Sequence, residues 1–225
     1  MQHLLAGSLV RLTYLQDRRA IAAIDWPAIF DDLTDAGMPM TRWQWCDMDA
    51  LTHVVLATDR ITGRYAGALG LSKRTTSEEP WLMIGVALVR PRDCRSTLPR
   101  AMLAHVLARI VCLDGKPAAV VASQTHQPAL TDLGRNIRSA TMHPPADGNV
   151  IALRTARLAH QIGVGRMVLD LRSISETSLL RDLRGLHGVR RERPKSAPDS
   201  AMAKPARSAA ATRRPRKATH TGRTG

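Results

Sequence analysis

The stretch WLMIGVALVRPRDCRSTLPRAMLAHVLARIV, residues 81–111, decides the fold of this 225-residue chain. It begins with the apolar run from Trp81 to Val89, which is typical of a central strand covered on both faces. A short basic loop follows, and from Leu98 to Val111 apolar residues recur at spacings of three and four, which predicts an amphipathic helix. Unpaired N–H groups and the positive end of the helix dipole meet where such a strand leads into a helix. The stretch therefore predicts a site for a phosphate or pyrophosphate.

The residues on both sides of this stretch predict further elements. In chain order, they are a strand at 8–16, one or two short helices within 18–36, a hairpin of strands at 53–58 and 65–72, a strand at 117–123, a short helix at 127–133 and an extended segment at 142–153. Asp25 is the expected N-cap of the second helix, and Gly63 is expected to supply the positive φ of the hairpin turn. Gly85, inside the central strand, indicates a bulge or the close approach of a ligand or backbone.

Composition divides the chain into three parts. Residues 190–225 carry eleven Lys or Arg against two acids, hence nine of the fourteen formal positive charges, and have almost nothing to bury. We therefore expect a domain at 1–155, a partly helical C-terminal extension at 156–189 and a disordered basic tail at 190–225.

The cysteines and the hydropathy pattern indicate the compartment. Three widely separated cysteines without a C-x-x-C pair argue against a disulfide framework or a zinc site. The start of the chain lacks a basic secretion-signal region, and no window approaches 18 uninterrupted apolar residues. We expect a soluble, cytoplasmic protein without a membrane partner.

The order of these elements resembles the GCN5-related N-acetyltransferase (GNAT) family over residues 8–153. Val89-Arg90-Pro91, with the basic loop and helix behind it, is similar to the family's acyl-CoA motif. Residues 117–123 are similar to the strand that follows, and residues 129–134 (ALTDLG) to the helix that ends in leucine-glycine. The resemblance implies an α/β (α+β) fold with a mixed, mostly antiparallel central sheet flanked by helices.

The resemblance also implies a coenzyme site, with acetyl-CoA or another acyl-CoA as co-substrate and no metal. Family members carry arginine-glycine-x-glycine in the pyrophosphate loop, where this chain has Cys94-Arg95-Ser96-Thr97, so it resembles a divergent member with a degenerate loop. Serine and threonine hydroxyls can donate hydrogen bonds there, and arginines can neutralise phosphate charge. The residues expected to bind the coenzyme are Leu88, Val89, Arg95, Ser96, Thr97, Leu98 and Arg100.

Three residues are candidates for proton transfer. Glu78 and Glu79 precede the central strand and can act as a base through a water, or they are solvated loop acids. His126 follows the next strand and titrates in a suitable range, or it is an ordinary surface or capping histidine. Leu130 stands where family members often carry the tyrosine that protonates the leaving thiolate. Cys94 is interpreted as a small loop residue rather than a nucleophile, because no base partner is evident.

Two hypotheses of different kinds follow. The first is an acyl-CoA-dependent N-acetyltransferase, an acyltransferase in which a small-molecule or protein amine attacks the thioester directly within a ternary complex. The second is a non-catalytic domain of the same fold whose tail, residues 190–225, binds nucleic acid non-specifically or an acidic partner; a solubilising tail is the plainer alternative. Residues 38–51 are expected to form a loop packed by its tryptophans, or else a wall of the acceptor site.

Overall fold

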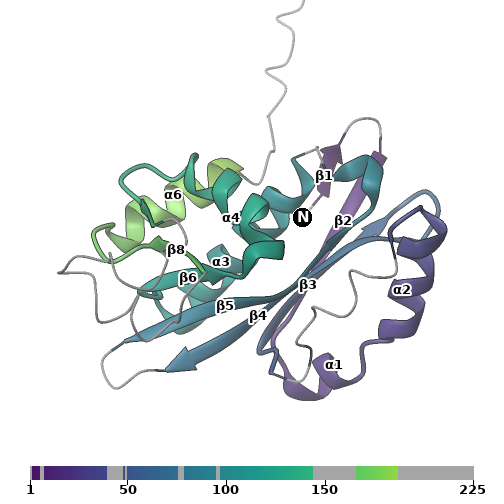
Figure 1. Ribbon diagram of the computed structural model, residues 1–225, viewed down its shortest axis with the longest axis horizontal. Coiled ribbons are helices and arrows are strands. Elements are labelled where there is room, and N and C mark those ends of the chain that lie inside the picture. Colours follow the sequence, from purple (N-terminus) through teal and green to yellow (C-terminus); the bar gives the residue numbers. More distant parts are fainter. Residues whose placement is uncertain are drawn as a thin grey trace, which may run out of the picture. The chain divides into compact units, whose positions relative to one another are not determined.

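An eight-stranded sheet forms the centre of the fold, in the strand order β1-β2-β3-β4-β5-β6-β8-β7 (Figure 1). Neighbouring strands are antiparallel except β5 and β6, which are parallel. The strands are β1 (Gln2–Leu5), β2 (Ser8–Leu15), β3 (His53–Asp59), β4 (Tyr65–Thr75), β5 (Pro80–Val89), β6 (Ala119–Ala122), β7 (Thr141–His143) and β8 (Met167–Asp170). This computed structural model describes residues 2–5, 8–39, 48, 50–75, 79–94, 97–143 and 166–186.

Helices cover both faces of the sheet (Figure 1). They are α1 (Arg18–Ala22), α2 (Trp26–Asp35), α3 (Leu98–Asp114), α4 (Gln127–Gly134) and α6 (Glu176–Leu186), with 3-10 turns η2 (Pro91–Asp93) and η3 (Gln124–His126). α1 and α2 pack on one face against strand residues such as Val54 and Val86. α3, α4 and α6 pack on the other face, in a larger core that includes Leu69 and Val120. The prediction of a mostly antiparallel α/β sheet flanked by helices is confirmed.

Helix α3 is buried more completely than its sequence pattern indicates. The apolar spacing predicts an amphipathic helix, but every residue from Ala101 to Leu107 is buried, including His105. The predicted helix and its apolar stripe are confirmed, but burial extends beyond the stripe because α3 contacts the sheet, α4 and α6 at once, so that its alanines and His105 are covered as well. Only the last turn has an exposed large apolar side chain, Leu113.

Two predicted turn and cap residues are confirmed. The Asp25 side chain caps α2 by accepting a hydrogen bond from the N–H of Ala28 at 3.0 Å. Gly63 has a φ of 73° in the turn between β3 and β4, a conformation that favours glycine. These local signals depend on neighbouring residues alone, which explains why the sequence was sufficient to identify them.

A bulge bends β5 in its middle. Gly70 of β4 pairs with Val86, and the next β4 residue, Leu71, pairs with Ile84. Gly85 is therefore the extra residue of β5, as one of the two predictions for it states. The bulge separates the first half of β5 from the half that contributes to the pocket described below.

The fold continues beyond the boundary predicted at residue 155. Strand β8 lies between β6 and β7 in the central sheet, and α6 packs on α3 through Leu179 and Leu183. The compact unit comprises residues 1–189. The segment predicted as a C-terminal extension is helical at α6, but its four-residue strand belongs to the core. A strand that short carries too few residues for a periodicity to be recognised.

Other predictions concern residues outside the described ranges. They cover most of the tryptophan-containing segment 38–51, the end of the extended segment at 144–153 and the basic tail at 190–225. In the part of the chain that the structure describes, no helix is long and apolar enough to cross a lipid bilayer.

Candidate functional site

The candidate site lies beside strand β5, which pairs with β6 over only part of its length. β5 pairs with β6 only at Leu82 with Val120 and at Met83 with Val121, whereas its pairing with β4 continues to Val89. Along Ile84–Val89, the described residues supply no strand partner on the β6 side. The backbone groups on that edge can therefore pair with a bound molecule, as an added strand would.

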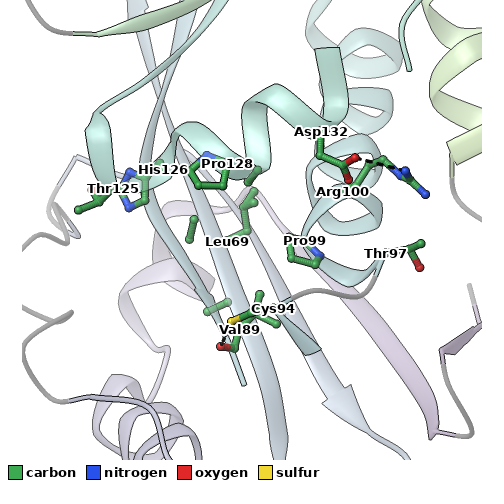
Figure 2. Close-up of a pocket in the computed structure, with 13 residues that line it drawn as sticks. Leu69, Val89, Cys94, Thr97, Pro99, Arg100, Thr125, His126, Pro128 and Asp132 are labelled. Carbon is green, nitrogen blue, oxygen red and sulfur yellow. Dashed lines mark hydrogen bonds and ion pairs between the residues drawn. The ribbon is translucent and has the colours of Figure 1, made fainter. Parts of the chain in front are cut away.

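A pocket of about 400 Å³ lies beside this half of β5 and is bounded by helices α3 and α4 (Figure 2). The lining residues are Ala68, Leu69, Ala87 and Val89 from the sheet, Cys94, Thr97, Pro99 and Arg100 from the loop and first turn of α3, and Thr125, His126, Pro128, Ala129 and Asp132 from η3 and α4. The sheet residues make the floor apolar. The polar groups gather at two separate ends, around Arg100 and around His126 (Figure 2).

One end of the pocket holds an ion pair. Arg100 in the first turn of α3 faces Asp132 of α4, with 3.5 Å between Nη1 and Oδ1 (Figure 2). Its Nε is buried and has no hydrogen-bond partner among the described residues. Thr97, the N-cap, makes no side-chain cap bond. The Arg100 guanidinium can therefore still donate a hydrogen bond, and it lies beside the positive end of the α3 dipole. This arrangement suits an anion.

The other end holds a buried histidine. His126 is 6 % exposed, and its Nδ1 lies 3.1 Å from Ser123 Oγ. Burial lowers the pKa of His126, and a hydrogen bond to the backbone of Ile84 opposes this only in part. The ring is therefore neutral at pH 7 and links η3 to β5, at the point where β5 and β6 separate.

A buried ion-pair network holds the loop between these ends. Arg90 donates from Nε to Asp93 at 2.8 Å and from Nη1 to Asp59 at 3.1 Å, and all three residues are buried. Burial alone raises the pKa of Asp59, but hydrogen bonds from Arg90 and from backbone N–H groups of the β3–β4 turn outweigh it and hold the pKa below its usual value. The network ties the loop after β5 to that turn. The sequence analysis missed it, although an arginine directly after a buried strand was a usable signal.

The structure brings four of the predicted residues together. Val89, Thr97, Arg100 and His126 all line the pocket. Cys94 lines it too, and its thiol donates to the Val89 carbonyl at 3.3 Å. This contact involves no base, as expected for a loop residue.

Other predicted residues lie elsewhere. Leu88 points into the core on the α1 and α2 face, and Leu98, the first residue of α3, is fully buried in the core on the opposite face. Glu79 is exposed at the beginning of β5, the end opposite the pocket, where its charge acts on Arg172. Arg95, Ser96 and Glu78 lie outside the described residues.

A second polar cluster lies away from the pocket. The Tyr14 hydroxyl is 2.9 Å from His53 Nδ1, and His53 Nε2 is 3.7 Å from Asp114, which also binds Lys73 at 3.3 Å. Burial, with the nearby Asp114 charge, raises the pKa of Tyr14 to about 12, and burial lowers the pKa of His53. In the described part of the chain, no group of three or more His, Cys, Asp or Glu side chains is placed to hold a metal ion.

Comparisons with known proteins bear on the fold. No family model and no curated protein matches the chain. Among solved structures, it is similar to an acyl-CoA N-acyltransferase from Pseudomonas aeruginosa, with 15% identity, coverage of 71% of this chain and 97% of that one, and a TM-score of 0.43. It is also similar to a diaminobutyrate acetyltransferase from Paenibacillus lautus bound to its substrate and coenzyme A, with 12% identity, 72% and 95% coverage and a TM-score of 0.40.

A third similar structure is the N-acetylglutamate synthase from Neisseria gonorrhoeae, in complex with coenzyme A and N-acetyl-glutamate. The identity is 13%, the TM-score is 0.39, and the match covers 72% of this chain but 35% of that one. All three TM-scores are below 0.5, so the fold is described by its own sheet and helices. At such identities the likeness concerns the course of the backbone, and the activity has to be argued from the residues of the pocket.

Proposed function

We propose that this protein is an acyl-CoA-dependent N-acyltransferase. The observation that carries the proposal is the edge of β5 at Ile84–Val89, which has no strand partner on the β6 side among the described residues, with a pocket beside it that is apolar along its floor and holds Arg100 at one end. The five residue steps of this edge span about 16 Å at the usual strand rise. An extended thiol ester with amide groups along its arm and a diphosphate at its end matches that length and polarity.

In this proposal, each part of the pocket contacts a different part of the acyl-CoA. The diphosphate lies at the beginning of α3, where Arg100 and the helix dipole neutralise its charge. The amides of the arm hydrogen-bond to the free edge of β5, with the backbone of Val89 among the groups that hold it, whereas the carbonyl of Leu88, the other residue predicted for this role, faces Gly67 of β4. A fixed, polarised thioester lets an amine attack it directly, so positioning supplies much of the rate.

The acceptor in this proposal is an amine, either a small molecule or a protein. Glu79 lies at the opposite end of β5 and is not placed to deprotonate it. The attacking amine then loses its proton to water or to a group outside the described residues. The reaction forms an amide and releases the free thiol of coenzyme A.

Calorimetric titration of the full chain with acetyl-CoA tests the proposal. We expect one saturable site, and we expect Arg100→Glu to weaken binding at least about tenfold because it places an anion beside the diphosphate. Arg138→Glu is the matched control, since Arg138 is exposed and lies outside the pocket lining. Absence of binding up to millimolar acetyl-CoA contradicts the proposal.

The second hypothesis rests on the charge of residues 190–225, which hold nine of the fourteen net positive charges. A non-catalytic domain with this tail binds DNA non-specifically, with an affinity that falls steeply with salt. Truncation after Val189 then abolishes DNA binding while acetyl-CoA has no effect. DNA affinity that survives the truncation counts against a role for the tail.

A further inference from the structure

We infer that His126 limits the length of the acyl group by closing the inner end of the pocket. The inference rests on the proposed function and adds a specificity to it. It concerns the end of the pocket opposite Arg100, where the ester group of an acyl-CoA anchored at Arg100 arrives (Figure 2).

The position of His126 follows from the strand pairing. Parallel pairing of β5 with β6 ends at Met83 and Val121, and the next β5 residue, Ile84, is bonded to the His126 ring through its backbone. The imidazole therefore lies at the apex of the gap between the two strands. Beyond it the sheet is continuous, so a ligand that runs along β5 from Arg100 meets this ring last.

Both sides of the ring are held. Ser123 Oγ lies 3.1 Å from Nδ1, and Ser123 Oγ in turn lies 3.0 Å from the Thr125 hydroxyl. The backbone group of Ile84 that favours a protonated ring is its carbonyl, which accepts from a ring N–H. A ring bonded on both sides and 6 % exposed is a rigid wall. Since the ring is buried and its Nδ1 faces Ser123 Oγ, this geometry assigns His126 to shaping the pocket rather than to general base catalysis.

The neighbouring wall residues are small or fixed by the sheet. Ala87 of β5 and Leu69 of β4 are opposite each other in the pairing of these two strands, so they cannot retreat to make room. The imidazole is thus a bulky group at this end that a substitution can remove without breaking a strand. An acetyl group fits in front of the ring, whereas a long acyl chain has to displace it.

Affinities of acetyl-CoA, butyryl-CoA and octanoyl-CoA for the full chain, measured by calorimetry, test this inference. For the wild type, we expect octanoyl-CoA to bind at least about tenfold more weakly than acetyl-CoA, because excess methylenes clash with a fixed wall. In His126→Ala, the octanoyl-to-acetyl ratio of Kd falls to about one or below, as the vacated apolar space takes up the chain. Arg138→Ala is the control, since Arg138 is exposed and lies outside the pocket lining, and its ratio stays that of the wild type.

Two further variants keep the test independent of folding. Ser123→Ala releases one side of the ring without removing it and is expected to give an intermediate ratio, and His126→Gln keeps both polar contacts and the wild-type preference. Equal binding of octanoyl-CoA and acetyl-CoA to the wild type, or an unchanged ratio in both His126→Ala and Ser123→Ala, overturns the inference while leaving the proposed function in place. Absence of binding of every thioester overturns both.

Discussion

Gly67 of β4, beside the pocket, has no room for a larger side chain. A Cβ built on this residue lies 2.7 Å from the Leu88 carbonyl oxygen and 3.3 Å from Val89 Cγ2. Gly67→Ala therefore has to push β4 away from β5, and we expect a loss of about 1–3 kcal/mol in the free energy of unfolding. Urea unfolding at pH 7 measures it.

Gly185, in contrast, has room for a larger side chain. A Cβ at this position of α6 meets no atom within 4 Å. Gly185→Ala is therefore expected to stabilise the protein by about 0.5–1 kcal/mol, because alanine loses less backbone entropy in a helix. A Gly67→Ala variant as stable as Gly185→Ala contradicts the packing described for β4 and β5.

Among the elements, the loop after β5 depends on its ion-pair network. Asp59→Ala leaves the Arg90 guanidinium buried with only Asp93 beside it, and we expect a loss of about 3 kcal/mol at pH 7. The pKa of Asp59 is held below its usual 3.8, so its stabilising contribution is complete above pH 3.8 and is lost as the pH falls through the lower folded-state pKa. Asp35→Ala, in an exposed pair with Arg64, is the control and costs less than about 1 kcal/mol. Equal losses in the two variants, measured by urea unfolding, contradict the assignment.

Lys116 fixes the turn that leads into α6. Its Nζ donates to the carbonyl oxygens of Leu171, Arg172 and Ile174 at 3.0, 3.0 and 2.6 Å. Lys116→Met leaves these carbonyls without their charged donor, and we expect a loss of about 2 kcal/mol with faster amide exchange in α6. Exchange in α6 that matches the wild type argues against this anchoring role.

The elements also show what the sequence can and cannot predict. β5, α2 with its Asp25 cap and the β3–β4 hairpin are defined by periodicity and by residues close in the chain, and they are predicted correctly. β8 has four residues, and its place between β6 and β7 is set by long-range pairing. The Arg90 network joins residues 31 positions apart, so the sequence holds its members but not their contact. The sequence also could not show which end of β5 the pocket adjoins. Glu79 lies just before the strand, at the end away from the pocket.

At the scale of the whole molecule, two buried histidines make stability depend on pH. Burial lowers the pKa of His53 and of His126 below the ordinary 6.5; for His53, Asp114 opposes the shift and Lys73 adds to it. Because the unfolded chain takes up these protons first, stability is complete above pH 6.5 and falls as the pH drops toward the folded-state pKa values. Unfolding curves between pH 7.5 and 5 measure the fall, which we expect to be smaller in His53→Gln. A pH-independent stability over this range contradicts the buried neutral state of both rings.

The central claim is that the unpaired edge of β5 binds an acyl-CoA, and amide hydrogen exchange with and without saturating acetyl-CoA tests it most directly. The proposal predicts slower exchange in residues 84–89 of β5 and at the beginning of α3, with little change in β7 and β8. Protection confined to the α1 side, where a second cavity is lined by Arg18, Trp26 and Leu51, or no protection at all, would contradict the account.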